Sequence, residues 1–500
     1  MVYTSVTCSS SRWRVKSVEQ SIAETDDPNT KLRKNLNWLD LTIFGVSVVI
    51  GAGIFTITAS TAANVTGPAI SLSFIIASIV CGLAALCYAE FASTIPVAGS
   101  AYTFAYATFG EFIAWIIGWD LILEFALAAS VVAKGWSSYL STIFSFTKTF
   151  NQAFGFHIDF GALFLVVLAT FLLIGGTKLS VTISTTITFV KVIVVLIVVI
   201  VGAFYIKIEN YFPFIPPTII INNTNTTRGL SNQTLFSLLF GTQTSQYGWY
   251  GVLSGASIVF FAFVGFDIVA ATAEETKCPQ RDIPKGILAS LGVVTVLYVA
   301  VSVILSGMVK YTELRDSETQ NLATAFILNN VNWAAQLISI GAIAGLTTVV
   351  IVLILGQTRV MLAMSRDGLL PCSLSRTSRK GTPIRVTFVV GSIIAFAAAF
   401  FPVDNLKDMV NIGTLFAFVL VSAGVVLLRY SRPDIQRNFR LPFMPILPLF
   451  SILSCLWLML NLTAMTWFRF GIWMILGIVI YIFYGYRNSI LGNQVNLCTD

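Results

Sequence analysis

Apolar segments long enough to cross a lipid bilayer recur along almost the whole chain. A membrane-spanning helix needs about 20 mainly apolar residues, and twelve segments of roughly this length can be placed. They cover residues 41–63, 68–93, 112–140, 161–175, 182–206, 250–272, 286–308, 333–364, 384–401, 406–428, 445–465 and 470–486. The sequence therefore predicts an all-α polytopic membrane protein with twelve transmembrane helices.

The charged residues agree with this class and indicate an orientation. Only 11% of the 500 residues are charged and 56% are hydrophobic, whereas soluble domains carry about 25% charged residues. With both termini in the cytoplasm, most of the 30 Lys and Arg fall on the inner side, as the positive-inside rule expects. We therefore expect a multi-pass plasma membrane protein with cytoplasmic tails at 1–40 and 488–500. The net charge of +7 needs no nucleic acid partner.

Glycosylation acceptors lie where this orientation places an external loop. Between the fifth and sixth predicted spans the sequence has three N-x-S/T sites, at Asn222, Asn225 and Asn232. Such sites are used only outside the cytoplasm. Their position supports the predicted orientation and predicts a glycoprotein.

The sequence lacks the residues that metal binding, ATP hydrolysis and enzymatic catalysis require. The chain has one histidine, His157, and its seven cysteines fall in predicted spans or on the cytoplasmic side, so no metal site or cofactor is expected. No phosphate-binding Walker sequence is present, and no nucleophile and base are clustered as an enzyme would require. We expect no enzyme. The bilayer, a substrate and a coupling ion are the expected partners.

Two predicted spans are interrupted by glycine. The first contains Gly51 and Gly53 within 49–55, and the sixth contains Gly265 within 260–267. Small residues can simply allow close packing of helices. A pair of glycine-interrupted spans in corresponding halves, however, is typical of a transporter that binds its substrate near the bilayer midplane.

Broken helices leave backbone groups that suit a zwitterion. Unwinding of the first span frees backbone N–H groups and turns the positive end of a half-helix toward the gap, where a carboxylate binds well. These donors belong to Gly51, Ala52, Gly53 and Ile54. Unwinding of the sixth span frees carbonyl groups that suit an α-ammonium group. These acceptors belong to Phe261, Ala262 and Val264. The pattern predicts an α-amino acid as the substrate.

Ionisable residues inside the predicted spans are functional candidates because they are costly there. Lys191 lies in the middle of the fifth span, and Asp267 directly follows the break in the sixth. We expect both to take part in proton coupling, although Lys191 could instead be a structural lysine paired with a carboxylate. Asp120 and Glu124 are four residues apart in the third span and share one helix face. Glu124 is the deeper of the two and could contact the substrate.

Several motifs resemble the amino acid–polyamine–organocation transporters, in the same order along the chain. They are YAEF at 88–91, PVAGSAY at 96–102, EETKCPQRDIP at 274–284, RVMLAMSRDGLLP at 359–371 and FRLP at 439–442. The segments 118–124 and 260–275 are most similar to the cationic amino acid transporter branch and its twelve-span prokaryotic relatives.

The resemblance implies a five-plus-five inverted repeat over residues 41–430, with two further helices over 431–487. It implies that the carbonyl groups of Val49 and Ile50 share the ammonium group, and that Leu346 contacts the substrate side chain. Lys191 corresponds to the place between the first, fifth and eighth spans where sodium-coupled relatives bind sodium. Ala52 departs from the Ser or Thr that is frequent in relatives.

These observations predict a proton-coupled secondary active transporter for α-amino acids. The apolar bulk of Leu346 favours neutral side chains of small to medium size. A cationic amino acid or polyamine transporter is the alternative, because Glu124 could pair with a positive side chain. A membrane sensor that binds amino acids without transporting them is a further alternative.

Overall fold

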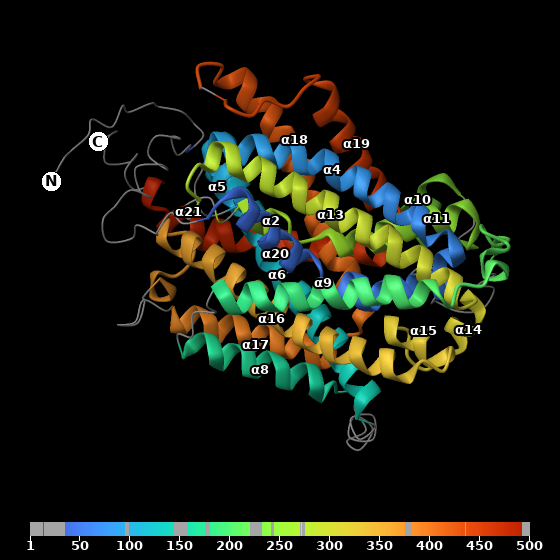
Figure 1. The fold of residues 1–500 in the computed structure, drawn as a ribbon. Helices are drawn as coiled ribbons and strands as arrows, with labels where there is room; N and C mark the ends of the chain where they lie inside the picture. The colour runs from blue at the N-terminus through green and yellow to red at the C-terminus, as the bar shows by residue number, and fades with distance from the viewer. Residues whose placement is uncertain are drawn as a thin grey trace, which may run out of the picture.

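The protein is described by a computed structural model in which α-helices dominate (Figure 1). It describes residues 14, 36–95, 100–144, 158–175, 181–220, 233–241, 245–270, 272, 276–375, 383–435 and 437–492. Among these residues, eight helices are long and apolar enough to cross a membrane, and four apolar helices are shorter. The segments predicted from the sequence overlap these helices, but the first is divided between Trp38–Val49 and Gly53–Thr94, and the latter also contains the second. The chain is therefore a polytopic α-helical membrane protein.

The helices follow the predicted spans closely, with short elements between them. The first half contains α2 (Trp38–Val49), η1 (Gly53–Ile57), α3 (Thr58–Thr61), η2 (Ala62–Thr66), η3 (Gly67–Ala69), α4 (Ile70–Thr94), α5 (Ser100–Thr108), α6 (Glu111–Ile143), α8 (Phe160–Ile174) and α9 (Val181–Ala203). The connection to the second half contains η4 (Ile208–Tyr211), β1 (Ile219–Ile220), α10 (Leu235–Phe240) and β2 (Ser245–Gln246). The two short strands pair antiparallel.

The second half begins with an interrupted helix, as the first half does. It contains α11 (Gly248–Val259), η5 (Phe260–Phe263), α12 (Asp267–Ala270), α13 (Pro279–Met308), α14 (Tyr311–Asp316), α15 (Leu322–Leu328), α16 (Asn332–Arg366), η7 (Cys372–Leu374), α17 (Ile384–Phe400) and α18 (Val403–Ser431). The chain ends with α19 (Ile446–Leu460), α20 (Ala464–Ile480), η8 (Tyr481–Gly485) and α21 (Tyr486–Asn488).

The connecting helices separate to opposite ends of the bundle (Figure 1). Helices α5 and α21 lie at one end, and α10, α14 and α15 lie at the other. In the predicted topology α5 and α21 belong to the cytoplasmic side, whereas α10, α14 and α15 belong to external loops. The arrangement thus keeps the two groups on different sides, as that topology requires.

Helix α6 forms the centre of the bundle. In its most apolar stretch 94% of the residues are buried, compared with 22% in the C-terminal span Ala464–Asn488. It packs along α16 and α18, while α4 packs along α13. Small residues on α6 allow neighbouring helices to approach closely; Gly118 and Gly135, for example, lie directly against side chains of other elements. This central helix passes beside both interrupted spans.

Candidate substrate site

The first predicted span is interrupted at its glycine pair. Helix α2 ends at Val49, and Ile50 has an extended backbone with φ −69° and ψ 91°. Helical structure resumes at Gly53 as the π-helix η1. The N–H of Phe55 in η1 donates to the carbonyl of Gly51 at 3.3 Å. The positive end of the half-helix that starts with η1 therefore lies at the interruption.

The sixth predicted span is interrupted as well. Helix α11 ends at Val259, and the 3-10 helix η5 continues to Phe263. Val264 is extended, with φ −61° and ψ 134°. Gly265 then has φ +116°, a conformation that glycine adopts at little cost. Helix α12 begins at Asp267, so the chain is non-helical over residues 264–266.

The two interruptions are in direct contact. A Cβ atom on Gly53 would lie 2.2 Å from the Cα of Ala262, so η1 and η5 approach at backbone distance. Gly265 also lies close to α2, since a Cβ there would lie 2.8 Å from Cγ1 of Val48. The backbone groups of both breaks therefore occur in one small region.

A cavity opens where the breaks meet α6 and α16. The cavity is narrow and open on one side. Among the described residues, the cavity is lined by Val48, Val49, Gly51, Ala52, Gly53, Ala128, Val132, Phe261, Val264, Val349 and Leu353. All of these residues are apolar, so the polar groups available to a ligand belong to the backbone.

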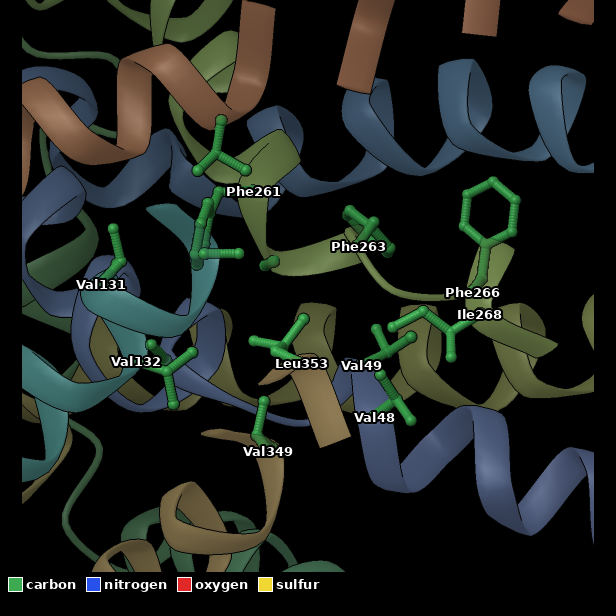
Figure 2. Close-up of a cluster of buried hydrophobic side chains, with 14 of the residues drawn as sticks. Val48, Val49, Val131, Val132, Phe261, Phe263, Phe266, Ile268, Val349 and Leu353 are labelled. Atoms are coloured by element: carbon green, nitrogen blue, oxygen red, sulfur yellow. The ribbon is translucent and has the colours of Figure 1, made fainter. Parts of the chain in front are cut away.

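Figure 2 shows side chains of four elements that meet in one buried apolar cluster, and several of them line the cavity. Val49 comes from α2, Val132 from α6, Phe261 from η5, and Val349 and Leu353 from α16. These side chains belong to one apolar cluster at the breaks. Such walls favour a branched or straight aliphatic side chain, because burying a charged group among them without partners is costly.

Tyr298 of α13 connects the two breaks through its hydroxyl group. The hydroxyl oxygen lies 2.7 Å from the carbonyl oxygen of Val49 and 3.0 Å from that of Ala262. The Ala262 carbonyl is one of the acceptors that the interrupted sixth span predicts for the substrate ammonium, and the family resemblance adds the carbonyl of Val49. The carbonyl oxygen of Phe261, another of these acceptors, accepts a hydrogen bond from the N–H of Val264 at 3.2 Å.

Lys191 lies between the first, fifth and eighth predicted spans. Its side chain is fully buried, and Nζ donates to the backbone carbonyl of Ser47 on α2 at 2.7 Å. On α16, a Cβ atom on Gly345 would lie 2.9 Å from Cγ of the lysine. Within the described part of the chain, no carboxylate forms a salt bridge with it. The described residues therefore give no support to the alternative in which Lys191 is a structural lysine paired with a carboxylate.

The intramembrane carboxylates form a separate group. Asp120 and Glu124 on α6 and Asp267 on α12 are all buried, and at least one oxygen of each has no hydrogen-bond partner among the described residues. Asp120 and Asp267 are close enough to influence Glu124 electrostatically. This group can hold protons, but none of its members lines the cavity.

The comparison with known proteins identifies the family. A family model described as amino acid permease matches residues 36–483. The chain belongs to the amino acid permease family. That assignment agrees with the resemblance to amino acid–polyamine–organocation transporters and makes this protein a membrane permease.

Relatives of this permease differ in the substrates that their names state. It is 41% identical to the branched-chain amino acid permease BcaP of Bacillus subtilis, over 95% of this chain and 98% of that protein. It is 38% identical to the methylthioribose transporter of the same species, over 96% and 99%. It is 35% identical to the vacuolar cationic amino acid transporter 4 of Arabidopsis thaliana, over 83% and 66%.

The structure of this permease brings together many of the residues that the sequence proposes for substrate binding. Those that line the cavity are Val49, Gly51, Ala52, Gly53, Phe261 and Val264. Others are outside its lining, namely Ile50, Ile54, Ala262, Glu124 and Leu346. Leu346 is fully buried one turn from Val349, and Ala262 faces Gly53. The glycosylation acceptors Asn222, Asn225 and Asn232 lie outside the described residues.

Sequence reasoning missed the contributions of α6 and α16 to the cavity. Ala128 and Val132 are four residues apart on α6, and Val349 and Leu353 are four apart on α16. Residues at this spacing share a helix face, so Leu346 together with helical periodicity could have indicated the two α16 residues. The role of Tyr298 could not be predicted in this way, because the sequence does not show which backbone groups a tyrosine within an apolar span contacts.

Proposed function

We propose that this permease is a secondary active transporter that carries neutral α-amino acids across the plasma membrane by proton-coupled symport with alternating access. The proposal includes twelve membrane spans, an inverted-repeat core over residues 41–430, two additional helices over 431–487 and cytoplasmic termini. The observation that carries it is the apolar cavity at the contact between two broken helices.

The geometry supports recognition of both ends of an amino acid. The start of η1 offers N–H donors and a helix N-terminus to the carboxylate, and the carbonyl groups of Val49 and Ala262 offer acceptors to the ammonium. A zwitterion can satisfy both sets at once. Methylthioribose has neither a carboxylate nor an ammonium group, so this arrangement favours an amino acid over that compound.

The walls support a neutral side chain. The aliphatic lining fits the substrates named for the branched-chain relatives, which include BcaP proteins of Bacillus subtilis and Lactococcus lactis. Transport of cationic amino acids is the second candidate, because relatives named for it are 29–35% identical and Glu124 is buried without a basic partner among the described residues. Glu124 is not part of the cavity lining, however, and this weighs against transport of cationic amino acids.

Counterflow in liposomes tests the substrate. The purified full-length protein would be reconstituted with unlabelled leucine inside, and entry of labelled leucine would be followed against protein-free liposomes. We expect leucine, isoleucine and valine to exchange rapidly, whereas arginine, leucinamide and methylthioribose compete poorly. Faster exchange of arginine than of leucine would instead favour the cationic transporter, and leucine binding without exchange would favour a sensor.

Protons are proposed as the coupling ion because Lys191 occupies the position between α2, α9 and α16. Its ammonium group donates to the carbonyl group of Ser47, as a bound cation would interact with that carbonyl oxygen. The buried carboxylates Glu124 and Asp267 provide further groups that can exchange protons. Leucine accumulation should therefore respond to an inward proton gradient in sodium-free buffer. Accumulation that requires sodium at a clamped pH would refute this coupling.

A further inference from the structure

Tyr298 is placed where a single side chain can act on both broken helices. Its side chain is fully buried, and its ring contacts Phe74 and Phe263, with centroid distances of 5.6 Å and 5.3 Å. These aromatic contacts fix the ring on α13. The hydroxyl group is thereby held within hydrogen-bonding distance of Val49 in the first span and Ala262 in the sixth.

One hydroxyl proton serves two carbonyl groups in this arrangement. A tyrosine hydroxyl has a single O–H donor, whereas each carbonyl oxygen has two lone pairs. Without a substrate, the carbonyl groups of Val49 and Ala262 therefore share one donor. A substrate ammonium brings three N–H donors and can bond to lone pairs that the hydroxyl leaves free. Hydrogen bonds from a charged donor are also stronger than those from a neutral one.

We propose that Tyr298 is a positioning residue for the substrate ammonium group. It holds the carbonyl oxygens of Val49 and Ala262 around one point, so that one ammonium group can bond to both. Tyr298 is not part of the cavity lining, so it acts through these two carbonyl groups. This inference rests on the proposed transport of amino acids and assigns the residue that orients their amino end.

The test compares Tyr298→Phe with Tyr247→Phe in the full-length protein. Phenylalanine keeps the ring at position 298 and removes only the hydroxyl. Tyr247 is a matched control, because it is also fully buried and its hydroxyl donates to a first-span carbonyl, that of Ala63, at 2.6 Å. Leucine binding would be titrated at equilibrium for each variant. The leucine analogue 2-hydroxy-4-methylpentanoate, which has a hydroxyl in place of the ammonium, would be titrated as a competitor.

We expect Tyr298→Phe to raise the half-saturating leucine concentration by about tenfold, the effect of losing one good hydrogen bond. The hydroxy acid should compete as it does with the unmodified protein, and Tyr247→Phe should keep normal leucine affinity. Unchanged leucine affinity in Tyr298→Phe would overturn the proposal, and so would an equal loss in both variants or an equal loss for both ligands. Where the hydroxy acid does not compete at all, the leucine titrations of the two variants decide. Failure of the unmodified protein to bind leucine would refute the proposed function itself.

Discussion

Gly53 and Ala262 approach so closely that no side chain fits between them. A Cβ atom on Gly53 would lie 2.2 Å from the Cα and 2.4 Å from the Cβ of Ala262, far inside van der Waals contact. The contact joins the π-helix of the first span to the 3-10 helix of the sixth. The glycine that begins η1 thus also lets the two breaks meet, and this meeting places donors from one span beside acceptors from the other.

Gly53→Ala should therefore destabilise the protein. The added methyl group meets backbone atoms, which cannot move away as a flexible side chain could, so η1 and η5 must separate. Overpacking of this kind typically costs about 1–3 kcal/mol. We expect a lower midpoint of thermal unfolding in detergent and a lower yield of monodisperse protein.

Gly51→Ala is the matched control for this prediction. The nearest atoms to a Cβ at Gly51 are methyl groups of Val349 at 3.6 Å, which is an ordinary contact. Gly51 lines the cavity, so the variant should keep its thermal stability while leucine binding weakens. Equal stability of the Gly53 and Gly51 variants would contradict the steric argument.

Lys191→Met should separate substrate exchange from proton-driven accumulation. Methionine replaces the buried lysine with a side chain of similar shape that cannot carry a proton. We expect leucine counterflow to continue, whereas accumulation driven by an inward proton gradient is lost. Lys310→Met provides the control, because Lys310 is exposed at the start of α14. Full gradient-driven accumulation by the Lys191 variant would rule out a coupling role.

The interruptions could be predicted from the sequence, but most of the cavity walls could not. Gly51, Gly53 and Gly265 reveal the breaks because glycine is unfavourable inside a helix. The faces of α6 and α16 are not revealed in the same way. Transmembrane helices are apolar on the lipid side and on the protein side, so hydrophobic periodicity does not distinguish the face with Val349 from the opposite one. Leu346, which the resemblance implies as a contact of the substrate side chain, lies one turn from Val349 and outside the lining.

The hydrogen-bond partners of the buried polar side chains also could not be predicted from the sequence. Carboxylates are the usual partners of a buried lysine, because opposite charges attract strongly in a medium of low polarity. In the structure the partner of the Lys191 ammonium group is instead the backbone carbonyl of Ser47. Every residue has a backbone carbonyl group, so the sequence does not indicate which carbonyl accepts a hydrogen bond from a buried side chain. For the same reason the two acceptors of Tyr298 could not be predicted.

Leu353→Ala should enlarge the cavity and change substrate preference. Leu353 lines the cavity from α16, so its truncation leaves space for a longer side chain while a small substrate loses contacts. We expect valine to bind more weakly and methionine or phenylalanine to compete better in counterflow. Leu355→Ala on the same helix is the control, since Leu355 is 37% exposed. An identical competition profile for both variants would show that Leu353 does not contact the substrate side chain.

Glu90→Gln should strongly destabilise the end of the bundle where α4 meets α18. The Glu90 carboxylate accepts two hydrogen bonds from Arg429, at 2.7 Å and 2.6 Å, and one from the N–H of Leu441 at 2.7 Å. Its side chain is only 4% exposed. Removing one partner of a buried ion pair leaves the other charge uncompensated and costs about 3–5 kcal/mol.

Asp434→Asn is the control, because the pair of Asp434 with Arg432 is exposed and such pairs contribute about 0–1 kcal/mol. Thermal unfolding should therefore show a large drop for Glu90→Gln and almost none for Asp434→Asn, and similar small shifts in both would mean that the buried pair contributes little.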